Sequence, residues 1–251
     1  MEYGKDYGRE EMFASACIRE IQEGDNIFHG LASPTPMVLM KAAKALGYEF
    51  TYMTLSDGLD HDWSRPPYSA STLTENTYTG SVATFGLDDI FDLFAGGKAH
   101  IAFLSCLQID KTGRIAMSVV GGPDYDHPKL RGPGGAGTAS VVPCCPRTII
   151  WKCAHNTRTM VEHVKFATTT AAEDRQMTLI TPLCIFRKPP GEKLLKLECI
   201  FPYSSVEEVK ENTAWEIDET DVPVCDPPTE AELAALNRVD PNRILLYEFN
   251  K

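Results

Sequence analysis

Short apolar segments with the character of strands alternate along this chain with single amphipathic helices, and this alternation constrains the fold more than any other feature. The predicted strands lie at 26–29, 50–55, 100–105, 148–153, 178–186 and 194–201. The predicted helices lie at 10–23, 33–46, 87–95, 205–212 and 229–238, the last two with capping boxes. Strands that alternate with single helices indicate an α/β fold with a mostly parallel sheet, in which ligands bind beyond the carboxyl ends of the strands.

Length and charge bound the class of protein. The 251 residues are 43% hydrophobic and 24% charged, which is typical of a globular chain with a sizeable core, and we expect a single domain over residues 1–251. The formal net charge of -11 opposes binding to nucleic acid or to an anionic membrane surface. No apolar run approaches the roughly 20 residues of a membrane-spanning helix. The N-terminal segment lacks the apolar core of a signal peptide, so a cytoplasmic protein is expected.

The eight cysteines do not follow the spacing of a metal site. Cys144, Cys145 and Cys153 form no C-x-x-C pair, and His155 has no second ligand pair nearby, so no metal site is expected. The remaining cysteines are isolated, several of them in apolar runs. We predict that they are small buried hydrophobic residues: Cys17, Cys106, Cys184, Cys199 and Cys225.

A glycine-rich stretch, RGPGGAG at 131–137, satisfies the dinucleotide-binding pattern G-x-G-x-x-G. That pattern requires a buried strand before the loop and a helix after it. Residues 125–130 are polar and interrupted by proline, and residues 140–143 are predicted to be extended chain, so a dinucleotide loop is not expected. Clustered glycines still permit positive φ angles and turn several amides toward one point, which suits a phosphate or an oxyanion. A flexible surface loop is the alternative.

A set of motifs occurs in order along nearly the whole chain: QIDKTGR at 108–114, DHPK at 126–129, GPGGAG at 132–137, ENTAWEID at 211–218 and VDP at 239–241. Together they resemble the β subunits of family I CoA-transferases, most closely the glutaconate CoA-transferase type. The resemblance implies one open α/β domain, an α-type partner in an α2β2 heterotetramer, and an acyl-CoA substrate, with coenzyme A as part of the substrate and no bound cofactor. It also implies that the oxyanion position of the thioester is framed by Gly134, Gly135, Ala136 and Gly137.

The chain departs from these transferases at the strand that ends near residue 55. In that family the strand delivers a glutamate whose carboxylate attacks the thioester; aligned on Gly58 and Leu59, this sequence has Ser56 instead. A serine ester lacks the activated acyl group that CoA exchange requires. Asp57 is a poor replacement for that glutamate, because its side chain is one methylene shorter and neighbouring residues on extended chain point in different directions. Asp57 equally suits an Asp-Gly turn, in which its carboxylate bonds to nearby amides.

The superfamily includes branches without the glutamate. Steroid ring-opening hydrolases resemble this chain in having a small hydroxyl residue followed by Asp-Gly, whereas a decarboxylase branch carries cysteine there. We therefore expect a β subunit that hydrolyses a carbon–carbon bond of a cyclic β-oxo acyl-CoA, with Ser56 and Asp57 as catalytic residues that bind substrate or position water. CoA transfer with a relocated carboxylate, decarboxylation and a non-catalytic scaffold subunit are the alternatives.

Further candidates for the substrate pocket are His29, His61, Trp63 and His127. His29 ends an apolar strand, and His61 and Trp63 follow the Ser-Asp-Gly turn in a loop whose aromatic residues suit a hydrophobic acyl group. The alternatives are a core histidine for His29, a solvated loop for His61 and a partner interface for the aromatic loop that carries Trp63. His127 lies in the DHPK motif and is equally interpreted as a residue that positions the glycine loop.

Overall fold

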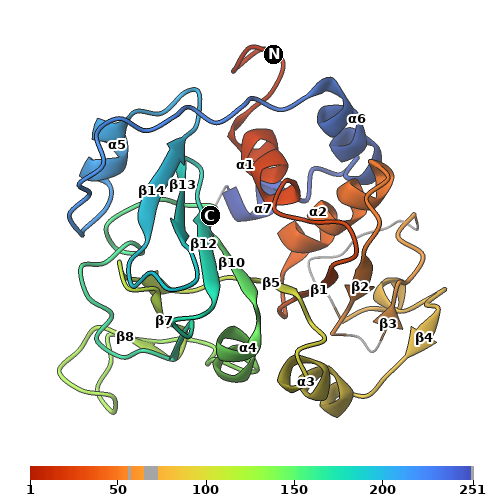
Figure 1. Ribbon diagram of the computed structural model, residues 1–251, viewed down its shortest axis with the longest axis horizontal. Coiled ribbons are helices and arrows are strands. Elements are labelled where there is room, and N and C mark those ends of the chain that lie inside the picture. The colour runs from red at the N-terminus through yellow and green to blue at the C-terminus, as the bar shows by residue number, and fades with distance from the viewer. Residues whose placement is uncertain (56–57, 65–72, 250–251) are drawn as a thin grey trace. The chain divides into compact units, whose positions relative to one another are not determined.

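The computed structural model describes residues 1–55, 58–64 and 73–249 and divides into two compact units (Figure 1). The first unit comprises Met1–Phe103 and Pro227–Lys251, and the second comprises Leu104–Asp226. In the described part of the chain, no helix has the length and apolar character needed to span a bilayer.

The first unit contains strands in the order β5-β1-β2-β3-β4. Their bounds are β1 (Asn26–His29), β2 (Thr51–Met53), β3 (Gly58–Leu59), β4 (Ala83–Thr84) and β5 (Ile101–Leu104). β1 pairs in parallel with β2 and with β5, so that Ile27 lies opposite both Tyr52 and Ile101. β3 and β4 extend the sheet in antiparallel pairing. β1 and β5 are mostly buried along their length, as parallel strands covered on both faces usually are.

The helices of the first unit are α1 (Arg9–Ile18), α2 (Pro34–Ala45), α3 (Leu87–Ala95), α6 (Glu230–Val239) and α7 (Leu246–Phe249), with a 3-10 turn at Glu75–Thr77. α1, α2 and α6 pack against one another (Figure 1). The sequence explains the ends of α2, because proline lies in its first turn, where an amide has no helical partner, and Gly47 follows its end with a φ of 88°. α6 begins at a capping box between Thr229 and Glu232, as predicted.

The second unit contains strands in the order β14-β13-β12-β10. Their bounds are β10 (Arg147–Trp151), β12 (Gln176–Ile180), β13 (Cys184–Lys188) and β14 (Lys196–Ile200). β10 and β12 are parallel, whereas β13 pairs antiparallel with both β12 and β14. The predicted α/β class is confirmed, with parallel pairing among β5, β1 and β2 in the first unit and between β10 and β12 in the second, and antiparallel strands next to them.

Smaller elements complete the second unit. One small sheet joins β6 (Gln108–Ile109), β7 (Arg114–Ala116) and β11 (Thr169–Thr170), and a two-stranded ribbon joins β8 (Val119–Val120) and β9 (Leu130–Arg131). Its helices are α4 (Thr138–Cys144) and α5 (Val206–Glu211). The tight turn of the QIDKTGR motif connects β6 to β7, with the amide of Gly113 bonded to the carbonyl oxygen of Asp110 at 2.9 Å.

The strand predicted at 178–186 is wrong, because the chain turns within it. Thr181 Oγ1 accepts hydrogen bonds from the amides of Leu183 and Cys184 at 3.2 and 3.3 Å, and Pro182 has no amide hydrogen to offer a neighbouring strand. β12 and β13 therefore form an antiparallel hairpin instead of one strand. The helix predicted at 10–23 also ends early, at Ile18; beyond the C-cap residue Arg19, the amides of Glu20 and Ile21 bond only three residues back.

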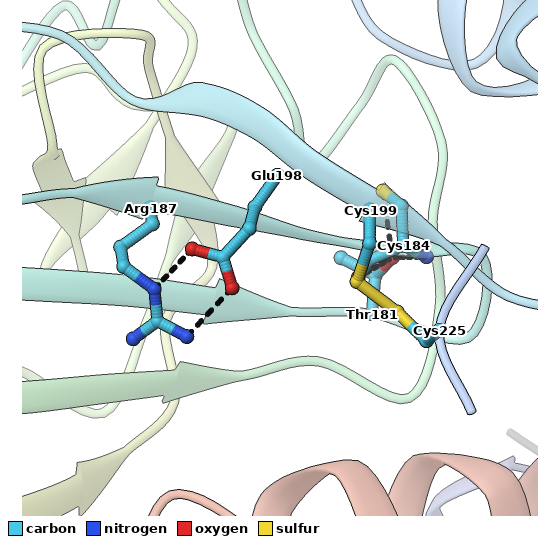
Figure 2. Close-up of a disulfide and its surroundings, with 6 residues drawn as sticks. All are labelled: Thr181, Cys184, Arg187, Glu198, Cys199 and Cys225. Carbon is cyan, nitrogen blue, oxygen red and sulfur yellow. Dashed lines mark hydrogen bonds and ion pairs between the residues drawn. A yellow bond between two sulfur atoms is a disulfide. The ribbon is translucent and has the colours of Figure 1, made fainter. Parts of the chain in front are cut away.

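The prediction for the isolated cysteines holds in part. Cys17, Cys106 and Cys184 are buried and form no disulfide within the described part of the chain, as expected. Cys199 and Cys225, however, form a disulfide, so their assignment as separate hydrophobic residues is wrong (Figure 2). The pairing depends on contacts distant in sequence: Ile200 of β14 accepts a hydrogen bond from the amide of Cys225 and donates one to the carbonyl of Pro223, at 2.8 and 3.1 Å.

Candidate functional site

Hydrogen bonds between Thr54 and Gly58 close the turn between β2 and β3, on either side of the two predicted catalytic positions. Ser56 and Asp57 themselves lie outside the described residues. Beside them, the amide of Thr54 donates to the carbonyl of Gly58 at 2.9 Å, and Thr54 Oγ1 donates to the carbonyl of Thr77 at 2.9 Å. A Cβ atom on Gly58 would lie 2.8 Å from that same carbonyl oxygen. Only glycine therefore fits where this turn returns to the sheet.

His29 lies at the carboxyl end of β1, and hydrogen bonds define its tautomer. Its Nδ1 lies 3.0 Å from the carbonyl oxygen of Gly30, which can only accept, so Nδ1 carries the proton. Nε2 is then an acceptor, and the hydroxyl of Tyr52 donates to it over 2.5 Å. Burial lowers the pKa of His29 to about 4, so the ring is neutral at pH 7. The imidazole is thus held in one orientation by two contacts.

His61 lies on the other side of Tyr52. The ring centroids of His61 and Tyr52 are 4.9 Å apart, and those of His29 and Tyr52 are 5.5 Å apart. His61 is only 3% exposed, and neither of its ring nitrogens has a hydrogen-bond partner among the described residues. Burial, followed by the charge of Lys41, lowers the pKa of His61 to about 4. A buried polar ring with no partner is rare in proteins.

Lys41 of α2 brings a positive charge into the same part of the first unit. The residue is buried, which lowers the pKa of its ammonium group to about 8, while Asp62 acts in the opposite direction. Neither Lys41 nor Tyr52 was identified from the sequence, because an apolar helix face and a strand position are ordinary places for the stem of a lysine and for a core tyrosine. The predicted pocket residues His29 and His61 are brought together around Tyr52.

Trp63, the third candidate in the first unit, packs against α6. The guanidinium carbon of Arg238, in the last turn of α6, lies 5.6 Å from the centroid of the indole ring. The side chain of Trp63 is only half-buried.

The glycine loop of the second unit has a strained backbone. Gly134 has a φ of 90°, and Ala136 has a φ of 43°, an angle that non-glycine residues seldom adopt. A Cβ atom at Gly135 would lie 2.5 Å from Cγ2 of Thr168. Thr168 is fixed in turn, because its Oγ1 accepts a hydrogen bond from the amide of Met117 at 2.9 Å. Strain held in place by its surroundings is a common mark of functional loops.

The free amides of the loop are Gly135, Ala136 and Gly137. These amides donate to no acceptor in the described part of the chain, whereas the amide of Gly134 bonds to the carbonyl of Met117 at 3.2 Å. Gly134 therefore shapes the loop while the other three amides are available to a ligand. Consecutive unpaired amides in a turn form a concavity suited to an anionic oxygen.

The extended chain predicted at 140–143 is wrong, because α4 begins directly after the loop at Thr138. The amides of Ser140 and Val141 bond to the carbonyl of Gly137 at 3.0 and 2.9 Å, and Pro143 lies near the helix end, where it stops further turns. The strand before the loop is β9, two exposed residues in antiparallel pairing. A buried strand leading into the loop, which dinucleotide binding requires, is therefore lacking.

His127 lies on the exposed connection between β8 and β9. Its Nδ1 contacts Asp124 Oδ1 at 2.9 Å, and its own amide donates to the same oxygen. Its carbonyl oxygen packs so closely against Gly122 that a Cβ atom there would lie 2.0 Å away. These contacts of His127 therefore lie within the connection between β8 and β9 itself.

His155 of the second unit lies in a separate buried polar cluster, whose contacts stabilise the fold. His155 Nδ1 bonds to Thr181 Oγ1 at 2.8 Å, its Nε2 bonds to Thr213 Oγ1 at 2.9 Å, and Cys184 Sγ lies 3.9 Å from Nδ1. Burial raises the pKa of Cys184 to about 12 and lowers the pKa of His155 to about 4, so both groups are neutral rather than a reactive thiolate pair. Within the described ranges, no three His, Cys, Asp or Glu side chains are grouped to hold a metal ion.

Comparison with known proteins gives consistent matches. A family model described as coenzyme A transferase matches residues 10–212. The B subunit of 3-oxoadipate CoA-transferase from Pseudomonas knackmussii is 28% identical over 93% of this chain and 94% of its own. The B subunit of glutaconate CoA-transferase from Acidaminococcus fermentans is 23% identical over 96% of this chain and 95% of its own. Among solved structures, the decarboxylase AibA/AibB is 25% identical with a TM-score of 0.86, covering 97% of this chain and 99% of that one.

Proposed function

Because the chain belongs to the coenzyme A transferase family, we propose that it is the B-type subunit of a heteromeric acyl-CoA enzyme that hydrolyses a carbon–carbon bond of a cyclic β-oxo acyl-CoA. The proposal is carried by the glycine loop, whose consecutive amides at Gly135, Ala136 and Gly137 donate to no acceptor among the described residues and suit a thioester oxygen that gains negative charge. Removing one donor of this kind typically costs an enzyme on the order of 10²-fold in rate.

Ser56 favours hydrolysis over transfer. The transferase route of this family needs a carboxylate at that position to form an acyl anhydride, and a hydroxyl group does not supply one. Ring opening needs only water and a stabilised enolate. Ser56 and Asp57 are assigned to binding the substrate or positioning that water.

The proposed reaction proceeds in balanced steps. Water loses a proton to a base and adds to the ring ketone, which becomes a tetrahedral alkoxide. The bond from that carbon to the α carbon of the thioester then breaks, and its electron pair forms the thioester enolate, whose oxygen the loop amides bind. The proton returns to the α carbon. The product carries a new carboxylate at one end and the intact CoA thioester at the other.

The partner is proposed to be an α-type subunit of similar fold in an α2β2 heterotetramer. Both CoA-transferase relatives are named as the B subunit of their enzyme, and the decarboxylase structure is named as a pair, AibA/AibB. The principal base is assigned to that α-type subunit. Coenzyme A enters as part of the substrate, with no separate cofactor.

CoA transfer is the second candidate, because the two relatives matched by sequence are CoA-transferases. It requires a carboxylate other than a glutamate at position 56, either Asp57 or one from the partner. Such a route forms a covalent thioester between enzyme and CoA, which hydroxylamine cleaves.

The deciding experiment uses the complex of this chain with its α-type partner. 2-Oxocyclohexanecarboxyl-CoA is incubated in oxygen-18 water, and products are followed by mass spectrometry. Ring-opened product that carries one label and retains CoA is the expected result. Turnover only after addition of acetate or succinate would establish transfer, and loss of carbon dioxide from a carboxylated acyl-CoA would establish decarboxylation. Ser56→Ala and Asp57→Ala complexes with unchanged rates would assign the chemistry to the partner alone.

A further inference from the structure

His61 is a buried group that the proposed chemistry of the glycine loop does not use. Its side chain is almost fully enclosed, yet both ring nitrogens are without hydrogen-bond partners in the described part of the chain. Buried polar atoms of this kind are normally paired, because burial without a partner is unfavourable. The exception at His61 indicates a hydrogen-bond partner that a ligand supplies.

The surroundings of His61 prepare it to bind an oxygen atom. Tyr52 packs against its ring and is itself held by the hydrogen bond to His29. Burial, and after it the nearby Lys41 charge, lower the pKa of His61 and keep its imidazole in the neutral form. A neutral imidazole has one N–H donor that it does not readily give up as a proton, so it polarises a carbonyl oxygen without becoming charged.

We infer that His61 is a catalytic residue that donates a hydrogen bond to a carbonyl oxygen of the acyl group and stabilises the negative charge that develops there. This inference rests on the proposed function and specifies an oxygen-binding group for it within the first unit. In ring opening, that oxygen belongs to the ring ketone, which becomes an alkoxide when water adds. The positive charge of Lys41 favours the same change in charge.

The location of His61 fits this role. Its neighbour Tyr52 lies on β2 and bonds to His29, the last residue of β1, at the end of that strand where parallel α/β sheets bind their ligands. The alternative is a histidine buried only for packing. In that case a phenylalanine of similar shape would serve equally well at position 61 and would relieve the unpaired nitrogens.

A binding experiment tests the inference without any turnover. The complex with the α-type partner is titrated calorimetrically with 2-hydroxycyclohexanecarboxyl-CoA and with cyclohexanecarboxyl-CoA, which differ only in the oxygen at the ketone position and have no ketone to hydrolyse. We expect the wild-type complex to prefer the hydroxylated compound by roughly 10-fold, the usual order for one hydrogen bond, and His61→Phe to lose this preference. His163→Phe, at an exposed histidine, is the matched control and retains it.

A kinetic experiment adds a second readout. We expect His61→Phe to lower kcat for ring opening on the order of 100-fold with a small change in KM, and His61→Gln, whose amide is also a donor, to recover part of the loss. Melting temperature and co-elution with the partner verify that each variant folds and assembles. His61→Asn replaces His61→Gln if the latter fails to assemble.

The outcomes separate the inference from the proposed function. Equal preference for the two ligands in wild-type and His61→Phe complexes, or no preference in either, overturns the inference. Unchanged ring opening by His61→Phe also overturns it and leaves the proposed hydrolysis standing. Loss of preference in His61→Phe together with absence of ring opening in the wild type supports oxygen binding by His61 and rejects hydrolysis.

Discussion

The hydroxyl of Tyr52 donates a hydrogen bond to Nε2 of His29 across 2.5 Å, and this contact orders the polar residues at the end of β1. Both side chains are buried, and the remaining ring nitrogen of His29 bonds to the carbonyl of Gly30. These hydrogen bonds fix the orientation of both rings, and the ring of His61 packs against the ring of Tyr52.

Tyr52→Phe removes this hydrogen bond while keeping the ring. We expect the free energy of unfolding to fall by about 1–3 kcal/mol, because Nε2 of His29 is left buried without a partner. Urea unfolding of the purified chain measures the change. Tyr247→Phe, at an exposed tyrosine, is the matched control. Equal stability of Tyr52→Phe and wild type would mean that water replaces the hydroxyl.

Stability is predicted to fall with acid below about pH 6.5. The pKa of His29 drops from 6.5 to about 4 on burial, so between these values the unfolded chain binds a proton that the folded chain does not. Folding stability is therefore complete above pH 6.5 and decreases toward pH 4, by roughly 3 kcal/mol for His29 alone. Unfolding measured from pH 7.5 to pH 4.5 tests this. His29→Gln should make the slope shallower without abolishing it, because burial lowers the pKa of His61 and His155 to about 4 as well. A wild-type profile without slope would contradict the prediction.

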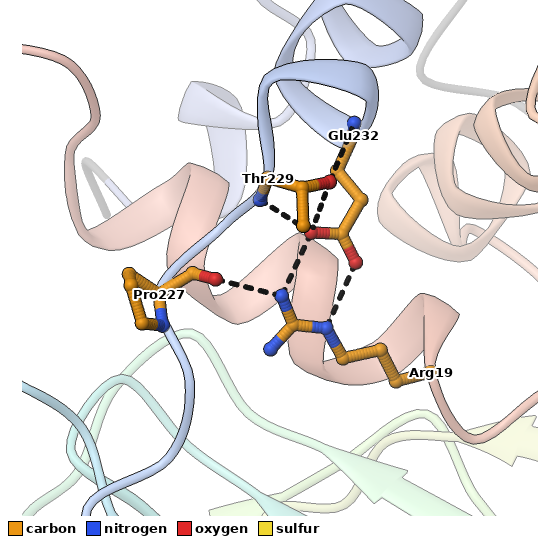
Figure 3. A network of polar contacts seen from close by, with 4 residues as sticks. All are labelled: Arg19, Pro227, Thr229 and Glu232. Carbon is orange, nitrogen blue, oxygen red and sulfur yellow. Dashed lines mark hydrogen bonds and ion pairs between the residues drawn. The ribbon is translucent and has the colours of Figure 1, made fainter. Parts of the chain in front are cut away.

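Glu232 links α6 to the end of α1 and is expected to stabilise the first unit. Its carboxylate accepts hydrogen bonds from Nε and Nη2 of Arg19, both at 2.8 Å, and from the amide of Thr229 at 2.7 Å (Figure 3). Glu232→Gln leaves the Arg19 charge partly buried and should lower the free energy of unfolding by about 2–3 kcal/mol. Glu2→Gln, in an exposed ion pair with Lys5, should change it by less than about 0.5 kcal/mol. Similar losses in both variants would contradict the assignment.

Gly135→Ala is predicted to displace the glycine loop, because the added methyl group would meet Cγ2 of Thr168. We expect activity of the complex to fall on the order of 10²-fold, since the loop amides no longer aim at the substrate oxygen. Thr168→Ser removes the opposing methyl group and keeps the hydroxyl that bonds to Met117. The double variant should regain most of the rate. A double variant as slow as Gly135→Ala would indicate that the loop is not limited by this contact.

The Cys199–Cys225 disulfide closes a loop with a sequence separation of 26 residues (Figure 2). Cys225→Ser should lower the free energy of unfolding by about 3 kcal/mol without reductant, because the unfolded chain gains freedom. In excess dithiothreitol the difference should vanish. Cys144→Ser, at a free cysteine, is the control and should behave as wild type in both conditions. A difference that persists under reduction would point to packing rather than the bond.

The sequence predicted those parts of the molecule that depend on near neighbours along the chain. The strand at Asn26–His29, the helix that begins at Pro34 and the capping box of Thr229 and Glu232 are confirmed, because periodicity and capping involve residues only a few positions apart. The order of the motifs predicted the family, and the family model bears this out.

Only the tertiary structure decided which polar groups find partners. Nothing near Cys199 in sequence indicates Cys225, and nothing near Tyr52 indicates His29, because sheet pairing brings these residues together. The helix after the glycine loop also depends on context, since Pro143 near its end favours extended chain by local rules. The sequence by itself therefore determined the elements and their family, which follow from local spacing. Burial and long-range packing determined that the imidazole of His61 is neutral and that it and the loop amides find no partner among the described residues, because both follow from contacts between distant residues.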